Sequence, residues 1–359
     1  MISLIKIEEK MRRPKDRVLS AISHKTPDRV PHDLSVVPEV ADRMREVLGV
    51  SNYQEVLKRL GIDMRYIFGI CEGPLHHSPR KTIFPDGMWQ DVWGVVRKTV
   101  SNVAGGTHEE VISYPLANAT SIEEIIHYLW PTTECYKYDH IKLLCQKNKE
   151  FALIGGYAHF FCPGADLRGY GSWLMDLAED STLAYAMLEK MEEFWLDYST
   201  RIYEAAKGML DIFYIADDYG MQEGMLISPD CWRKMFKPII KRFIDWAHKR
   251  GMYTMLHSCG SIRPIISELI ECGLDILDPI QPLARDMNPY ELKKEFGKDL
   301  CFHGGVDIQR LLPFGTVNDV RDEVHRLIET LGQNGGYILS PAHQVQADVP
   351  AENVIAIFI

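Results

Sequence analysis

A histidine and a cysteine two residues apart, His257 and Cys259, are the side chains whose types and spacing point most directly to chemistry. Both are common zinc ligands, and a zinc ion with three protein ligands keeps a fourth position open for a substrate. The pair follows Tyr253-Thr254-Met255-Leu256, which is typical of a buried strand. Side chains two apart on a strand point to the same side, so the imidazole and the thiol can converge on one ion. In the alternative interpretation both residues are buried and satisfied locally.

Polar residues also lie at the ends of other strand-like stretches in the second half of the chain. Asp217-Asp218 follows the apolar stretch 210–216, and two later stretches lead into His303 and His343. Carboxylates and imidazoles at strand ends are candidates for orienting a substrate or moving a proton. We therefore predict catalytic roles for Asp217, Asp218 and His303. A role in loop structure or helix capping is the alternative for the two aspartates.

The segments between these stretches have helical patterns. Residues 230–249 have helical periodicity with Pro238 inside, and Ser261 is a candidate N-cap for a helix over 262–272. Strands separated by helices at this spacing predict βα units and a parallel sheet. An open doubly wound sheet collects ligands at one switch point, whereas a closed barrel uses the ends of successive strands. We therefore expect an α/β fold, a (β/α)8 TIM barrel, with the polar strand ends on one rim.

The first half of the chain fits this pattern less regularly. Residues 70–115 contain alternating stretches such as Trp89-Gln90-Asp91-Val92-Trp93 and predict a β-rich insertion. The N-terminal residues 1–13 have the mixed charges of an amphipathic, helical lead-in. The chain shows no internal repeat, low-complexity tract or linker. We expect one domain over residues 1–359.

Composition excludes several classes of protein. The formal net charge is -10 and the basic residues are dispersed, which argues against a nucleic-acid partner. The sequence contains no apolar run of about 18 residues, so no membrane span is expected. Its eight cysteines are scattered without a CxxC pair, and residues 1–13 lack the apolar core of a signal peptide. These features predict reduced thiols and a cytoplasmic protein.

Several segments together resemble the uroporphyrinogen decarboxylase superfamily. The resemblance covers nearly the whole chain and rests on Thr26-Pro27-Asp28-Arg29-Val30-Pro31, Asp217-Asp218-Tyr219-Gly220, His257-Ser258-Cys259-Gly260, Phe302-His303-Gly304-Gly305-Val306-Asp307 and Asp348-Val349-Pro350-Ala351-Glu352-Asn353-Val354. Within the superfamily, the chain is most similar to the corrinoid-dependent methyltransferase branch. The resemblance implies the barrel fold, but its motifs do not identify a substrate.

The methyltransferase branch resembled here includes methylcobalamin:coenzyme M methyltransferases, which bind zinc through an HxC pair and a distant cysteine in an SPGC-type segment. His257 and Cys259 match the first two ligands. The segment Ser340-Pro341-Ala342-His343 has a histidine where that group has the third cysteine. Histidine is a competent zinc ligand. The resemblance therefore implies a zinc site formed by His257, Cys259 and His343.

The resemblance also implies an activity and a partner. We expect a zinc-dependent methyltransferase that moves a methyl group between a corrinoid (cobalamin) and a small thiol, ether or amine. The chain has no stretch resembling the DxHxxG loop that holds a corrinoid, so we expect a partner protein to carry it.

Uroporphyrinogen decarboxylation itself is not expected. That enzyme has an arginine-rich motif soon after the DRxP segment, whereas residues 31–36 contain no arginine. The alternative function is a metal-free decarboxylase or lyase of the same superfamily that acts on a small carboxylate, with Arg168 and Arg263 as candidate anion ligands.

Overall fold

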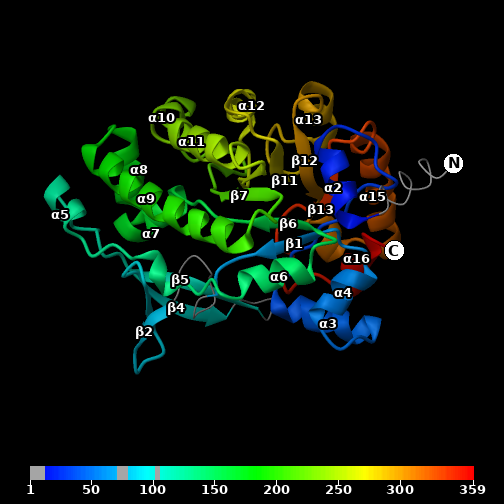
Figure 1. Cartoon of the computed structure of the whole chain (residues 1–359), viewed down its shortest axis with the longest axis horizontal. Helices are drawn as coiled ribbons and strands as arrows, with labels where there is room; N and C mark the ends of the chain where they lie inside the picture. Colours follow the sequence, from blue (N-terminus) through cyan, green and yellow to red (C-terminus); the bar gives the residue numbers. More distant parts are fainter. Residues whose placement is uncertain (1–12, 71–79, 102–105) are drawn as a thin grey trace.

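Seven parallel strands form the sheet that carries the polar residues (Figure 1). The computed structural model describes residues 13–70, 80–101 and 106–359, so the expected lead-in lies almost wholly outside the described residues. In spatial order the strands are β1 (Met64–Ile67), β6 (Ala152–Gly155), β7 (Ile212–Ala216), β10 (Tyr253–His257), β11 (Ile276–Ile280), β12 (Cys301–Val306) and β13 (Tyr337–Pro341). Each strand pairs in parallel with its neighbours.

The inward side chains of these strands form two successive layers. The first layer is apolar and includes helix α2 (Pro14–Ile22); its members are Val18, Ile22, Met64, Ala152, Ile154, Ile212, Met255, Ile276, Cys301 and Ile338. Because side chains alternate along a strand, the residue two positions further faces the same interior, nearer the carboxyl ends. On six strands these residues line one cavity: Tyr66, Tyr214, His257, Asp278, His303 and Ser340. The apolar layer therefore forms a base beneath the polar one.

The sheet curls as the barrel expectation requires, but seven strands are assigned to it rather than eight. A short segment, Pro31 to Asp33, runs parallel to β13, where Asp33 donates to the Leu339 carbonyl over 2.9 Å. On its other side the His32 carbonyl accepts from Asp63 N–H, just before β1, over 2.9 Å. Pro31 has no N–H to donate, which keeps this pairing short. The structure thus confirms the curled α/β architecture.

Helices follow the strands and pack outside the sheet; in Figure 1, α10 to α13 form an arc over the strands. These outer helices are α9 (Thr182–Ala206), α10 (Pro229–Met235), α11 (Lys237–His248), α12 (Ile266–Cys272), α13 (Pro289–Phe296), α15 (Val317–Leu331) and α16 (Ala351–Ala356). The other helices are α3 (Pro38–Leu48), α4 (Tyr53–Arg59), α5 (Ile122–Ile126), α6 (Ile141–Lys147), α7 (Phe161–Arg168), α8 (Tyr170–Ala178) and α14 (Leu311–Phe314). No helix in the described part of the chain combines the length and apolar character needed to span a membrane.

Two local predictions need correction. The segment expected as one kinked helix over 230–249 is divided into α10 and α11, because Pro238 has no N–H for a continuous helical ladder. The predicted N-cap at Ser261 is wrong. A 3-10 turn, Arg263–Ile265, precedes α12, and Ser261 instead donates its N–H to the Met221 carbonyl over 2.8 Å.

The expected β-rich insertion is confirmed for its described residues. An antiparallel sheet contains β2 (Arg80–Ile83), β3 (Trp89–Asp91), β4 (Val96–Ser101) and β5 (Thr107–Ser113). It lies below α7 and α9 in the view of Figure 1. The buried guanidinium of Arg97 joins this sheet to α7 through Asp91 and Asp166, at 3.2 and 2.6 Å. The paired carboxylates offset the cost of burying that charge.

Candidate active site

A cavity of about 450 Å³ opens at the carboxyl ends of the parallel strands. Five of the six predicted site residues line it, and the sixth, Cys259, places its Sγ 3.4 Å from the Nε2 of His257. The five are Asp217, Asp218, His257, His303 and His343. His303 lies within β12 rather than at its end, because the strand continues through Gly304 and Gly305. Residues distant in sequence thus meet in one hollow.

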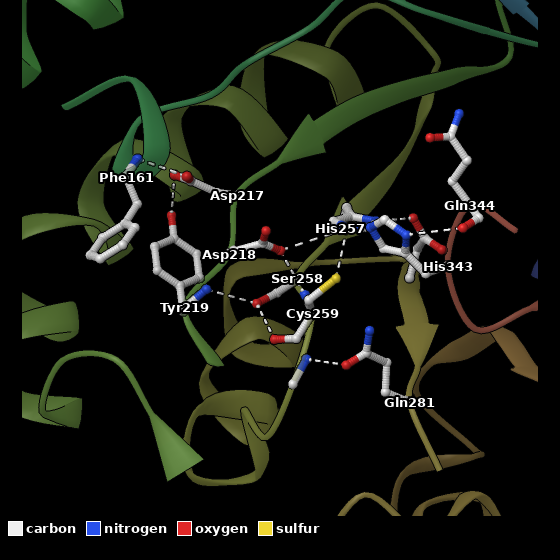
Figure 2. Close-up of polar contacts among 12 residues, drawn as sticks. Phe161, Asp217, Asp218, Tyr219, His257, Ser258, Cys259, Gln281, His343 and Gln344 are labelled. Carbon is white, nitrogen blue, oxygen red and sulfur yellow. Dashed lines mark hydrogen bonds and ion pairs between the residues drawn. The ribbon is translucent and has the colours of Figure 1, made fainter. Parts of the chain in front are cut away.

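His257, Cys259 and His343 form a donor cluster at one side of the cavity (Figure 2). Their potential ligand atoms, two imidazole nitrogens and one thiol sulfur, all lie within 4.8 Å of one another. The two imidazole rings stand 5.7 Å apart. All three residues are only partly buried. The predicted ligands are therefore brought together at a face that a small molecule can reach.

Asp278 fixes the orientation of His257. One carboxylate oxygen lies 2.8 Å from His257 Nδ1 and 3.1 Å from the hydroxyl of Tyr214. The bond to Nδ1 leaves Nε2 directed at Cys259. A carboxylate behind a histidine in this way sets its tautomer and raises its basicity as a metal ligand. Asp278 was not among the site residues predicted from the sequence.

The loop after β10 holds Cys259 through backbone packing. Gly260 has φ +74°, and a Cβ there would lie 2.5 Å from the carbonyl carbon of Gly220. Only glycine accommodates both that backbone conformation and the close approach. The Gly260 N–H donates to the Gln281 side chain over 2.7 Å. These contacts keep the cysteine beside the end of its strand.

The two adjacent aspartates face different neighbours (Figure 2). Asp218 accepts from the Cys259 N–H over 2.8 Å, and the same oxygen lies 3.6 Å from His257 Nε2. Asp217 turns away and accepts from the Phe161 N–H and the Tyr219 hydroxyl, over 2.7 and 2.8 Å. Burial raises the pKa of Asp217 to about 7, although these donors favour its anion. Asp218 therefore contacts the donor cluster, while Asp217 caps the start of α7.

A chain of hydrogen bonds extends from the donor cluster across the cavity floor. Asp278 contacts His257 with one oxygen and His303 Nδ1 with the other, at 2.7 Å. His303 Nε2 lies 3.1 Å from Asp33, which also accepts from the Tyr66 hydroxyl over 2.8 Å. Burial disfavours a charged His303, but Asp278 and Asp33 raise its pKa to about 9. His303 is thus held as a cation between two carboxylates.

Hydrogen bonds and the charge of Asp278 together shift the pKa values of the donor cluster more than burial does. Burial alone would raise the pKa of the Cys259 thiol, but His257 and His343 hold that pKa below its usual value. Burial likewise opposes protonation of His257, yet the charge of Asp278 raises the pKa of this imidazole well above the usual range. The bond to Cys259 raises the pKa of His343 against the effect of burial. The contacts within the cluster thus lower the pKa of the thiol and raise the pKa values of both imidazoles.

The donor set suits zinc. Zinc bonds of about 2.0–2.3 Å place the ligands of a tetrahedral site roughly 3.3–3.7 Å apart. Side-chain movements of about 1 Å bring the three atoms from their present span to that spacing. Asp278 supplies the outer carboxylate typical of histidine-ligated metals. The residues therefore fit a site with two nitrogens, one sulfur and an open fourth position.

Of three further polar residues, one histidine lines the cavity and two arginines do not. His159 lines the cavity with its Nε2 3.7 Å from Asp217. Arg168 is instead bound to Asp176 at 2.7 Å and to backbone carbonyls, and Arg263 pairs with Glu295. Neither arginine lines the cavity. These two arginines therefore do not supply an anion site in this cavity.

Sequence reasoning missed Asp33, Tyr66, Tyr214 and Asp278, all of which line the cavity. A usable signal existed for Asp278, since it follows Ile276-Leu277 in a strand just as His257 ends its own. The tyrosines had no such signal, because aromatic residues in strands are typical of any core.

Comparisons with known proteins are consistent with this geometry. The profile of a family described as uroporphyrinogen decarboxylase (URO-D) matches residues 111–358. Two curated proteins of Methanosarcina barkeri, one of them from strain Fusaro, are named methylcobamide:CoM methyltransferase MtaA. Each is 23% identical over 218 residues, which span 60% of this chain and 60% of the relative.

The structural comparison extends over more of the chain. A solved structure described as a methyltransferase from Methanosarcina mazei matches with a TM-score of 0.65. The match covers 96% of this chain and 97% of that chain, at 19% sequence identity. At that identity it shows a shared fold alone.

Proposed function

This chain belongs to the uroporphyrinogen decarboxylase family, and on that premise we propose that it is a methyltransferase with one zinc ion at His257, Cys259 and His343. The observation that carries the proposal is the convergence of their three ligand atoms within 4.8 Å at the cavity. The family resemblance of the sequence is confirmed. We also propose one domain with a closed barrel, in which residues 31–33 occupy the place of the eighth strand.

Zinc at this site would act as a Lewis acid that lowers a thiol pKa or polarises a leaving-group oxygen. The chain's own residues provide the setting. Asp278 holds the His257 ring with Nε2 toward the cluster, and Asp218 fixes the Cys259 backbone and faces the substrate side. Both nitrogens of His303 contact carboxylates, so the geometry favours a role for His303 in positioning Asp278.

The methyl carrier in this proposal is a corrinoid held by a partner protein. The chain contains no stretch resembling the DxHxxG corrinoid loop. The cavity of about 450 Å³ has room for a small substrate, whereas a corrinoid is several times larger. Methyl transfer would occur where the partner covers the cavity mouth. The substrate in this reading is a small thiol, ether or amine.

Uroporphyrinogen decarboxylation is not supported by the cavity. A porphyrinogen with eight carboxylates needs several fixed cations, such as arginines. The segment after Pro31 instead directs Asp33 and Ser35 into the cavity. The described lining residues include no lysine or arginine. The proposed activity therefore differs from the reaction in the family's name.

The test combines metal analysis with corrinoid spectroscopy. Purified wild-type protein should contain about one zinc per chain, and Cys259→Ala should contain almost none. Cys231→Ala is the matched control, because Cys231 is a half-buried thiol in α10 outside the cluster. With methylcobalamin and a panel of anionic, neutral and cationic small thiols, wild type should form cob(I)alamin and the Cys259 variant should not. Equal zinc content or equal demethylation in both proteins would refute the proposal.

A further inference from the structure

Four aromatic side chains form a ring of contacts on one wall of the cavity. The proposed zinc site gives them no role. They are Tyr66, Phe68, Tyr157 and Tyr214, and we name them the aromatic box. Neighbouring ring centroids are 6.0 Å apart for Tyr66–Phe68, Phe68–Tyr157 and Tyr157–Tyr214, and 6.1 Å for Tyr214–Tyr66. Two of the four pairs are nearly perpendicular, at 89° and 85°. The four rings thus surround a common region instead of stacking in a row.

The charges around the box favour a cation. Asp33, Asp218 and Asp278 line the cavity, whose described lining includes no lysine or arginine; Asp217 is instead occupied in capping α7. Beside the box, His303 lies between Asp33 and Asp278 and offsets one of their two charges. The other two imidazoles between the box and Asp218, His257 and His343, belong to the donor cluster. Carboxylates in excess attract positive ligands and repel sulfonates and carboxylates.

Hydrogen bonds to these carboxylates also make two of the rings better suited to a cation. The Tyr66 hydroxyl donates to Asp33 over 2.8 Å, and the Tyr214 hydroxyl donates to Asp278 over 3.1 Å. Donation to a carboxylate increases the electron density of a phenol ring, and it fixes the ring in place. Aromatic faces attract cations through their quadrupole, most strongly where water is excluded. Both tyrosines are therefore prepared for a positive ligand.

The box adjoins the donor cluster. The rings of Tyr214 and His257 are 6.3 Å apart, and those of His257 and His343 are 5.7 Å apart. The box and the cluster are therefore neighbouring parts of one cavity. A small two-ended ligand that extends from one to the other fits the cavity volume of about 450 Å³.

We propose that the aromatic box binds the ammonium end of a small organic cation, so that the sulfur or oxygen at its other end faces His257, Cys259 and His343. The inference rests on the proposed function, which makes the sulfur or oxygen the reacting end, and it adds the class of substrate. It predicts that this chain selects a cationic substrate over an anionic sulfonate such as coenzyme M. Recognition of ammonium groups by aromatic cages supplies the physical basis.

The test is a comparison of two ligands of equal shape. Choline and 3,3-dimethylbutan-1-ol differ in the charged nitrogen, which the second replaces with carbon. Isothermal titration calorimetry on the metal-free wild-type protein should show choline binding about tenfold tighter. Ethanesulfonate should bind more weakly than either. Equal affinity for the two isosteres, tighter binding of the neutral methoxyarene guaiacol, or no choline binding would overturn the inference.

Variants of Phe68 link the affinity to the box. Phe68 is partly exposed, so its replacement is compatible with folding. Phe68→Leu should weaken choline binding about tenfold and leave the neutral isostere nearly unchanged, whereas Phe68→Tyr should retain choline affinity. Phe314→Leu, at an 82% exposed phenylalanine in α14, is the matched control and should have no effect. Unchanged choline binding in Phe68→Leu would contradict the inference.

The outcomes separate this inference from the proposed function. Choline binding requires neither zinc nor a corrinoid, so it would persist if the chain lacked zinc or methyl transfer. Conversely, zinc binding and methyl transfer could be established while choline and its isostere bind equally. That second result would refute the preference for a cationic substrate and leave the proposed methyltransferase function intact.

Discussion

The two walls of the cavity are built from different chemistry on the same sheet. The donor wall, His257, Cys259 and His343, comes from the ends of β10 and β13, and its groups are nucleophilic and able to bind a metal. The aromatic wall is the aromatic box, which comes from β1, β7 and the segments after β1 and β6. Asp278 contacts both walls, through His257 and through Tyr214. In our two proposals, the donor wall would hold the metal and the aromatic wall would select the substrate.

Removing the third ligand should have the largest effect on the donor wall. His343→Ala should lower the methyl-transfer rate by about 100- to 1000-fold, because Lewis-acid stabilisation is worth several kcal/mol. His343→Cys should retain zinc, since a thiolate is also a good ligand. His325→Ala, an exposed histidine in α15, is the control. Zinc content and methyl-transfer rate should be measured on the same samples. A His343→Ala protein with full activity would show that His343 is not a zinc ligand.

Asp278→Asn tests the residue shared by the two walls. An amide cannot accept from His257 and His303 as a carboxylate does, so zinc affinity should fall about 10- to 100-fold. Competition with a zinc chelator gives the affinity, and circular dichroism checks the fold. If affinity changed less than twofold, the ring of His257 would not depend on Asp278 for its orientation.

The two thiols at the cavity should differ in their response to pH. Hydrogen bonds from His257 and His343 lower the pKa of Cys259, whereas burial and the charges of Asp217 and Asp218 raise the pKa of Cys162 well above its usual value. A thiolate exists above its pKa, so in metal-free protein Cys259 should react with iodoacetamide at lower pH than Cys162. At pH 7 we expect at least about tenfold faster labelling of Cys259.

Peptide mass spectrometry at several pH values measures the two labelling rates separately. Bound zinc should protect Cys259 and leave Cys162 unchanged. Faster labelling of Cys162 than of Cys259 at pH 7 would contradict the pKa shifts of the two thiols.

Tyr214→Phe should produce the smallest effect. The variant keeps the ring of the aromatic box and loses the hydroxyl that donates to Asp278. Loss of this bond should lower the free energy of unfolding by about 1 kcal/mol. Choline affinity should change less than threefold, because the ring face is retained. Urea denaturation and calorimetry measure the two quantities; a tenfold loss of affinity would mean that the hydroxyl, and not the ring, contacts the ligand.

The donor wall could be anticipated from the sequence because its information is local. His257 and Cys259 are two residues apart at the end of an apolar stretch, and the strand was predicted with the boundaries that β10 has. The helix expected over 262–272 also ends at the predicted residue, because Gly273 follows α12 with φ +94°. Spacing and turn residues are properties of neighbouring positions, so they can be recognised before the fold is known.

The aromatic wall could not be anticipated, because it depends on contacts between distant segments. Tyr66 and Tyr214 are 148 positions apart in number, yet their rings are neighbours at 6.1 Å. Nothing local distinguishes them from Phe213, which points outward from the same strand into the helix layer and stacks on Phe243. Only the curl of the sheet decides which aromatic residues face the cavity.

The most direct test of the central claim is zinc X-ray absorption spectroscopy of the purified protein. We expect one sulfur at about 2.3 Å and two histidine nitrogens at about 2.0–2.1 Å from the zinc ion. Cys259→Ala should lose the sulfur scatterer together with most of the metal, and Cys231→Ala should match wild type. A zinc ion without a sulfur neighbour, or a protein that binds no zinc when metal is supplied, would contradict the account.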